Sequence, residues 1–362
     1  MKTVSRRNLL RLAGTLGLGL AAGACSRDPE VGATPAAVVQ TLAPATPPPA
    51  MKATAALTNG SPSGSVVTKA ASGVSVSPAA TVSRPPTPTP APPGAADVAV
   101  VHGEDAEAIV RRALEALGGI QRFVQTGYDV IIKPNICNAN HGPEYASTTN
   151  PVVVATLVRM CLEAGAAKVR VMDNPFAGSA ERAYASSQVG DAVAAAGGEI
   201  EIMAPHRFVD ADIPLGRDIQ SWPFYKPILD ADLVINVPIA KHHGLARLTL
   251  GGKNMMGCIE NRGGIHRNLG QRIADLISRI SPQLTVIDAT RILLANGPTG
   301  GNLADVQVAN TIIASQDIVA ADAWATSLFG RVPEDIGYIV AAHEMGLGTM
   351  DLSTLNVVEL TV

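Results

Sequence analysis

The 362-residue sequence has little net charge and few cysteines, and each shortage excludes a class of protein. Its 28 lysines and arginines are balanced by 31 aspartates and glutamates, so it lacks the cationic excess of a nucleic-acid-binding protein. None of its four cysteines lies in a C-x-x-C pair, which excludes a zinc ribbon or a self-contained ferredoxin-type cluster, and so sparse a set predicts no disulfide framework. The hydrophobic content of 47% excludes a chain that is disordered throughout.

The sequence near the N-terminus also lacks a hydrophobic run long enough to be a confident membrane-spanning helix. The uncharged stretch Leu12–Ala24 follows the pair Arg6-Arg7, which is typical of a secretory signal and resembles the twin-arginine pattern that exports folded proteins. Cys25 follows small residues and resembles the cleavage site of a bacterial lipoprotein. We therefore expect residues 1–25 to be a signal. The protein is expected in the periplasm or on the outer face of the cell membrane, with a lipid anchor on Cys25.

Residues 26–95 have a composition that does not form a core. The segment from residue 31 onward holds half of the 26 prolines and almost no aromatic side chain. Proline fixes φ and donates no backbone hydrogen bond, so such a segment stays extended and solvated. We expect it to be a disordered linker that holds the folded region, residues 96–362, away from the membrane.

Within residues 96–362, short apolar runs alternate with helical patterns. Leu233–Val237 is almost entirely apolar, which is typical of a strand buried on both faces. Pro151–Glu163 begins with a proline, as helices often do, and Ala180–Ala195 is predicted to be one helix. The alternation predicts an α/β fold with a single main domain, in which helices cover both faces of a mostly parallel sheet. Ligands of such sheets bind beyond the carboxyl ends of the strands.

Polar side chains follow the strand predicted at Tyr128–Ile132. Lys133 and Asn135 come directly after it, and a lysine in that place has few structural explanations. Thr149 lies just before the next helix, whose free N–H groups could bind an anion or simply be capped by Asn150. We expect Lys133, Asn135 and Thr149 to bind a ligand.

Two carboxylates occupy equivalent places after other strands. Asp173 follows the strand predicted at Lys168–Met172, although its Asp-Asn-Pro sequence is equally typical of a turn. Asp288 follows the strand predicted at Leu284–Ile287. The glycine-rich segment Asn296–Gly301 is expected to be a mobile loop that could close over a bound group. Both aspartates are candidate acid–base groups.

The densest group of reactive side chains follows the strand 233–237. Two lysines, three histidines and a cysteine lie within about 26 residues: Lys241, His242, His243, Lys253, Cys258 and His266. They could form an anion pocket from the lysines and the backbone of Gly252, or a metal site from the histidines and Cys258, or only a polar loop. Adjacent histidines point apart on most backbones, so at most one of the first pair is expected to join a metal site.

Asp322 lies inside an otherwise apolar helical pattern. A buried carboxylate needs a partner, because an unpaired charge in the core costs several kcal/mol. One of the lysines at 133, 241 and 253 is expected to provide it, unless Asp322 faces the solvent.

Several of these motifs, in this order, resemble the bacterial and archaeal family catalogued as domain of unknown function 362. The resemblance extends from about Tyr128 to Gly348. Some relatives carry a ferredoxin-like domain, but this sequence lacks the closely spaced cysteines, so that cofactor is not inferred. The matching positions are Lys133, Asn135, Lys241, Lys253, Asn254, Asp288 and Asp322.

The sequence therefore predicts an exported enzyme that acts on a small anionic ligand, with the cofactor unknown. The ligand would be held by Lys133, Asn135, Thr149, Gly252, Lys253, Asn254 and Asp322, and Asp173, Lys241, His242 and Asp288 are candidate catalytic residues. Two alternatives stay open. One is a tethered binding protein without turnover, and the other is a metal or iron–sulfur protein with His243, Cys258 and His266 as ligands.

Overall fold

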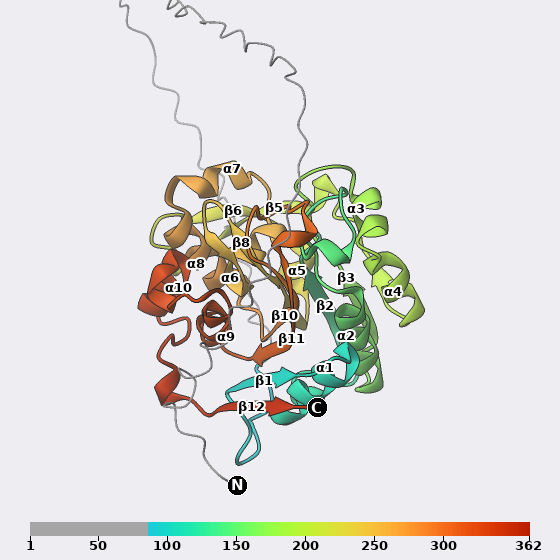
Figure 1. The fold of residues 1–362 in the computed structure, drawn as a ribbon. Coiled ribbons are helices and arrows are strands. Elements are labelled where there is room, and N and C mark those ends of the chain that lie inside the picture. Colours follow the sequence, from blue (N-terminus) through green and yellow to red (C-terminus); the bar gives the residue numbers. More distant parts are fainter. Residues whose placement is uncertain (1–85) are drawn as a thin grey trace, which may run out of the picture. The chain divides into compact units, whose positions relative to one another are not determined.

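A computed structural model describes residues 86–362 (Figure 1). The predicted signal, the anchor site at Cys25 and most of the predicted linker lie outside the described residues. Among the residues described, none of the helices combines the length and the apolar character needed to cross a membrane.

A ten-stranded sheet forms the centre of the described region. Its main path follows the order β12 (Val357–Thr361), β1 (Val98–His102), β11 (Val306–Ser315), β10 (Leu284–Leu293), β7 (Leu233–Val237), β2 (Asp129–Pro134), β3 (Lys168–Val171) and β4 (Glu199–Ile200). Beside this path, β8 (Ile239–His243) pairs with β10 and with β9 (Arg247–Thr249). A separate hairpin is formed by β5 (Phe208–Asp212) and β6 (Ser221–Tyr225).

The sheet is mixed but mostly parallel, which confirms the predicted fold class. The run from β10 through β7, β2 and β3 to β4 is parallel throughout, and β11 is antiparallel to both of its neighbours. Helices cover both faces, and Figure 1 shows one group on each side of the sheet. One group comprises α1 (Ala106–Ala116), α2 (Pro151–Glu163), α3 (Ala180–Ser186) and α4 (Val189–Ala195). The other comprises α6 (Gly251–Asn254), α8 (Leu269–Ile280), α9 (Ile318–Ala325) and α10 (Gly337–Glu344).

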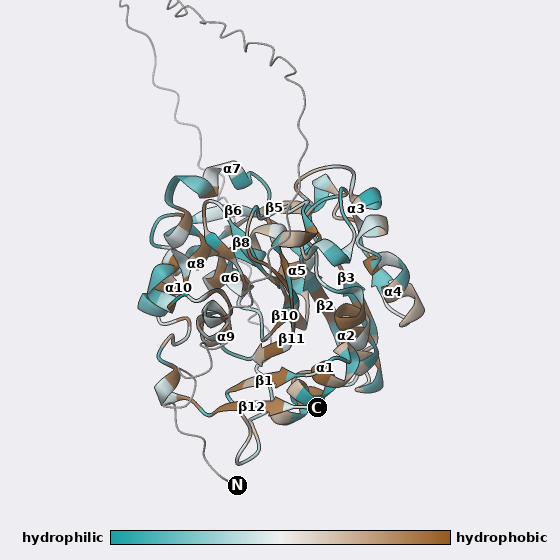
Figure 2. Cartoon of the chain, in the orientation of Figure 1, coloured by the Kyte–Doolittle hydropathy of each residue, from teal (hydrophilic) through white to brown (hydrophobic). Residues whose placement is uncertain are grey.

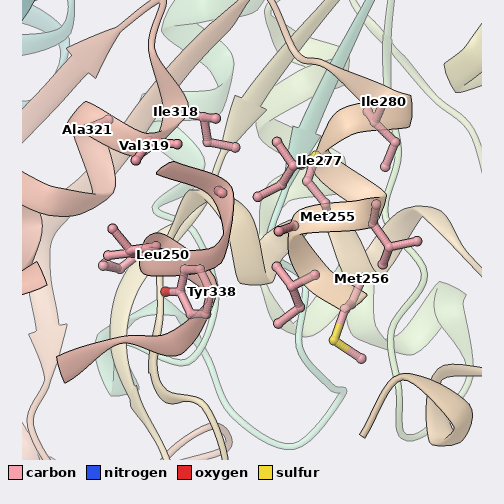
Figure 3. Packing of buried hydrophobic residues seen from close by; sticks show 14 of the residues in the cluster. Leu250, Met255, Met256, Ile277, Ile280, Ile318, Val319, Ala321 and Tyr338 are labelled. Carbon is pink, nitrogen blue, oxygen red and sulfur yellow. The ribbon is translucent and has the colours of Figure 1, made fainter. Parts of the chain in front are cut away.

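Successive strand residues enter different cores, because side chains alternate across a strand. In β2, Val130 and Ile132 pack with α1 and α2, whereas Ile131 faces the cluster built by α8, α9 and α10. Figure 2 shows the hydrophobic residues concentrated in the central strands. Figure 3 shows the second cluster, where Leu250, Met255 and Ile277 lie among residues of α9 and α10. Two short helices, α5 (Lys226–Asp230) and α7 (Arg262–Ile265), complete the α-helices of the described region.

The structure corrects some predicted boundaries. The predicted helix Ala180–Ala195 is divided into α3 and α4, because Gln188 between them has a left-handed backbone with φ of 60°. Strand β2 continues to Pro134, so Lys133 lies within the strand instead of after it. Strand β10 runs from Leu284 to Leu293, which places Asp288 in its middle. Strand β7 and helix α2 have the predicted bounds.

Asp322 is buried in α9, at 2% exposure, and the expected lysine partner is wrong. Its two carboxylate oxygens instead accept the backbone N–H groups of Gly251 and Gly252, at 2.6 and 2.8 Å. Burial raises the pKa of Asp322 to about 7, and the two N–H groups oppose that rise. The carboxylate thus fixes the first turn of α6 against α9.

We expect Asp322→Ala to lower the free energy of unfolding by about 2–4 kcal/mol, because it leaves two buried N–H groups without an acceptor. Denaturant titration measures the change. Asp210→Ala removes an exposed carboxylate from β5 and should change stability by less than about 0.5 kcal/mol. Equal effects of the two substitutions would show that the contact with α6 does not stabilise the fold.

Candidate functional site

A cavity of about 260 Å³ lies near the carboxyl ends of β2 and β3 and beside β8. This is the edge at which parallel sheets bind ligands. Eleven of its lining residues are polar or charged, namely Lys133, Asn135, Asp173, Asn174, Lys241, His243, Thr249, Lys253, Asn254, Arg262 and His266, and Cys137 also lines it. Segments that lie far apart in the sequence therefore line the same cavity.

A buried ion pair forms part of the cavity wall. Lys133 Nζ lies 2.9 Å from Asp173 Oδ1, and the two side chains are only 1% and 4% exposed. Lys133 also donates to Asn254 Oδ1 at 2.7 Å, and the backbone N–H of Ile136 donates to Asp173 Oδ2 at 2.6 Å. The charges are thus both paired and hydrogen-bonded, as burial requires.

Lys241 is saturated by neutral oxygens. Its ammonium donates to Asn135 Oδ1 at 3.0 Å, to the Ser147 carbonyl at 2.6 Å and to the Pro298 carbonyl at 2.9 Å. An ammonium has three N–H donors, so this set uses all of them. Burial lowers the pKa of Lys241 from its ordinary value. Lys241 thereby connects three segments of the chain, which contain Asn135, Ser147 and Pro298.

Lys253 and Arg262 differ from the other cations of the cavity. In the part of the chain that the structure describes, neither side chain has a hydrogen-bonded or ion-paired partner. Burial, followed by the charge of Lys241, lowers the pKa of Lys253 to about 8. Burial also lowers the pKa of Arg262 from its usual value. Both groups are available to a ligand.

Two histidines of the cavity are held neutral by the same positive surroundings. Burial and then Lys253 and Lys241 lower the pKa of His243 to about 3, and burial and Lys253 lower that of His266. The backbone N–H groups of Leu245 and Ala246 donate to His243 Nδ1 at 3.1 and 3.2 Å. Nδ1 is therefore an acceptor and the proton of the neutral ring resides on Nε2.

Among the described residues, six of the predicted site residues do not line the cavity, namely Cys258 and the following five. Asp288 accepts the backbone N–H groups of Asn150 and Thr290, at 2.7 and 2.9 Å, and burial raises its pKa. The other four contact the backbone or form part of it: His242 accepts from Gly297, Thr149 donates to Val237, Asp322 holds α6, and Gly252 is one of the donors to Asp322. These residues support the segments around the cavity.

His243, Cys258 and His266 are not assembled as metal ligands. Within residues 86–362, no group of three or more His, Cys, Asp or Glu side chains is placed to hold a metal ion. Cys258 is fully buried and lies off the cavity wall, and burial raises the pKa of its thiol to about 12.

Sequence reasoning missed Cys137, Thr249 and Arg262 as residues of the cavity. Cys137 follows Asn135 by two positions, so its proximity to the end of β2 was a usable signal. Thr249 and Arg262 gave none, because a threonine in a short strand and an arginine in a glycine-rich turn are ordinary surface residues. The loop at Asn296–Gly301 contributes the Pro298 carbonyl that Lys241 contacts.

Gly257 lies directly beside the buried ion pair. A Cβ at this position would collide with Asp173 Oδ1 and Lys133 Nζ. We expect Gly257→Ala to destabilise the protein by about 1–3 kcal/mol, because rigid, hydrogen-bonded groups must move. Thermal or denaturant unfolding measures it. Gly263→Ala is the matched control, since nothing lies within 4 Å of its Cβ position. A Gly257 variant as stable as this control would contradict the described packing.

Two solved structures align with part of the chain. The lactate racemase apoprotein from Thermoanaerobacterium thermosaccharolyticum aligns with a TM-score of 0.42 and 12% identity, covering 66% of this chain and 58% of that one. A Thermotoga maritima protein aligns with a TM-score of 0.35 and 10% identity, covering 64% and 60%. Each alignment spans less than two thirds of the solved chain.

Comparison with known sequences gives a relative of higher identity and a family match. The thylakoid-associated protein sll1697 of Synechocystis sp. (strain ATCC 27184 / PCC 6803 / Kazusa) is 30% identical over 257 residues, which cover 66% of this chain and 74% of the relative. The family described as domain of unknown function DUF362 matches residues 130–327, which include all the lining residues of the cavity named above. The chain belongs to this family, as the order of its motifs predicted.

Proposed function

We propose that the cavity binds a small anion carrying a carboxylate or phosphate group, and that the protein catalyses a reaction of this anion. The observation that carries the proposal is the pair of unpartnered cations, Lys253 and Arg262. Asp173 is the one carboxylate among the described lining residues, and Lys133 already pairs with it. An excess of positive charge in a confined space attracts and retains anions.

Proton transfer is the chemistry that these groups support. A general acid or base works best when its pKa lies near the operating pH, and Lys253 has a pKa of about 8. The neutral imidazoles of His243 and His266 line the same cavity. Lys253 is therefore a better acid–base candidate than Lys241 or Asp288, because internal hydrogen bonds hold those two side chains.

The volume limits the ligand. A cavity of about 260 Å³ is slightly smaller than typical ligand sites, which measure about 300–1,000 Å³. The ligand is thus a small metabolite with one or two anionic groups. Turnover of such a molecule by the purified protein would distinguish an enzyme from a binding protein that uses the same cavity.

Substitution of Lys253 tests the proposal. We expect Lys253→Met to weaken sulfate binding at least tenfold, because it removes a charge-assisted contact while keeping the length of the side chain. Isothermal titration calorimetry measures the affinity. Lys168→Met is the matched control, since this lysine is 44% exposed and pairs with Glu199 on the surface, and it should leave sulfate binding unchanged.

The same site should respond to pH with a defined sign. Sulfate keeps its charge in alkaline solution, whereas Lys253 loses its proton as the pH rises through about 8. Wild-type affinity should therefore fall about tenfold between pH 7 and 9, and the Lys253→Met variant should show no such fall. If neither the substitution nor the change in pH alters the affinity for sulfate, the proposal is wrong.

We propose further that the protein is exported and held at a membrane surface by a lipid on Cys25. The support is the order of features in the sequence: Arg6-Arg7, an uncharged stretch, Cys25 and then the proline-rich segment. A lipid anchor followed by a long proline-rich segment would leave the folded region in the aqueous compartment.

We expect Cys25→Ala in the full chain to move the protein from the membrane fraction to the soluble fraction, because the acceptor of the lipid is lost. Cell fractionation with immunoblotting measures this. A chain with Arg6→Lys and Arg7→Lys should instead accumulate unprocessed inside the cell. Unchanged partitioning of the Cys25 variant would exclude this anchor.

A further inference from the structure

Cys137 places a thiol on the wall of the cavity. The residue follows β2 and is 5% exposed. Its Sγ donates to the Pro298 carbonyl at 3.3 Å, and Asn138 Nδ2 donates to the sulfur at 3.5 Å. The sulfur is thus held in place by one acceptor and one donor.

A cation lies beside this sulfur. Lys241 Nζ donates to the same Pro298 carbonyl, at 2.9 Å, so the ammonium and the thiol meet at one oxygen. The two groups interact, since Cys137 opposes the lowering by burial of the pKa of Lys241. An ammonium in this place stabilises negative charge that develops on sulfur.

A second, independent feature of the cavity wall is a buried polar group without a hydrogen-bond partner among the described residues. Thr249 lines the same cavity and is 3% exposed, yet its hydroxyl has no hydrogen-bond partner among the described residues. A buried hydroxyl without a partner costs free energy unless a ligand or water satisfies it. Together with the ammonium of Lys253, it offers donors to a bound oxyanion.

We propose that Cys137 is the nucleophile of this cavity and that its sulfur attacks an electrophilic carbon of the bound anion. The inference rests on the proposed function, because the cations that retain the anion also bring its carbon to the thiol. Neither the sequence pattern nor the family description assigns a role to this cysteine.

A group that lines the cavity can accept the proton that the attack releases and return it to the product. The neutral imidazole of His266, which lines the same cavity, accepts the thiol proton, while Lys253 keeps its charge and retains the anion. The sulfur lone pair forms a carbon–sulfur bond to a carbonyl carbon, and the π electron pair moves to the carbonyl oxygen. His266 then returns the proton to that oxygen. The net change is addition of S–H across C=O, without an oxidant or a reductant.

The other thiols of the described region provide internal controls. Cys161 and Cys258 are fully buried and lie off the cavity wall, and burial raises the pKa of both. A reagent that enters the cavity should therefore modify Cys137 and spare these two residues.

The test compares an anionic alkylating reagent, iodoacetate, with its neutral analogue iodoacetamide on the full chain. In each case sulfur bonds to carbon, iodide leaves and the thiol proton is released. Peptide mass spectrometry gives the rate for each cysteine. We expect the iodoacetate-to-iodoacetamide rate ratio at Cys137 to exceed that of glutathione by about tenfold, because the cavity concentrates anions.

Two variants locate the cause of that preference. Lys253→Met should bring the ratio to within about twofold of the glutathione value, while Lys253→Arg, which keeps the charge, should retain it. Circular dichroism checks that both variants are folded. If Cys137 reacts as slowly as Cys258, or shows the same ratio as glutathione, the inference is wrong.

Sulfate binding by the same preparation separates this inference from the proposed function. If sulfate binds through Lys253 but Cys137 is unreactive or unselective, Cys137 is not the nucleophile. The proposed anion site is supported in that case. Absence of sulfate binding would refute both.

Discussion

The buried ion pair of Lys133 and Asp173 is the constraint on which the cavity depends. Two charges removed from water are stable only when each is paired and its remaining donors and acceptors are used. Asn254 accepts a further hydrogen bond from Lys133, and the backbone N–H of Ile136 donates to Asp173. Gly257 has no side chain, and the pair occupies the space where a Cβ would lie. The segment from α6 to residue 258 is thereby fixed over β2, and the same segment carries Lys253 to the cavity.

The cavity remains positive because its cations are satisfied unequally. Lys133 has a carboxylate partner and Lys241 has three neutral oxygens, whereas Lys253 and Arg262 have no partner among the described residues. Burial, and then the charges of Lys253 and Lys241, lower the pKa of His243 to about 3. A site in which imidazoles are neutral and one lysine titrates near neutrality suits proton transfer on an anion better than tight metal coordination.

Buried carboxylates of this protein serve different purposes according to what surrounds them. Asp275, Asp288 and Asp322 accept backbone N–H groups and hold a loop, a helix start and α6, respectively. Asp173 also accepts a backbone N–H group, from Ile136, but its other oxygen pairs with a lysine. Three of them support the fold without touching the cavity, so a buried aspartate in an apolar segment does not by itself mark a catalytic group.

The amino-acid sequence determined the elements and the edge at which the lysines meet. Helix α2 and strand β7 follow from local patterns, and Lys133 lies near the carboxyl end of β2, where parallel sheets bind ligands. Lys253 reaches this edge because α6 packs over β2. Only the tertiary structure decided that Asp288 accepts from Asn150, 138 positions away, and that Asp322 accepts from Gly251 and Gly252, about 70 positions away. It also brought Cys137 beside Lys241. Which atoms remain unpaired after burial depends on the packing of distant segments, and no local pattern records that.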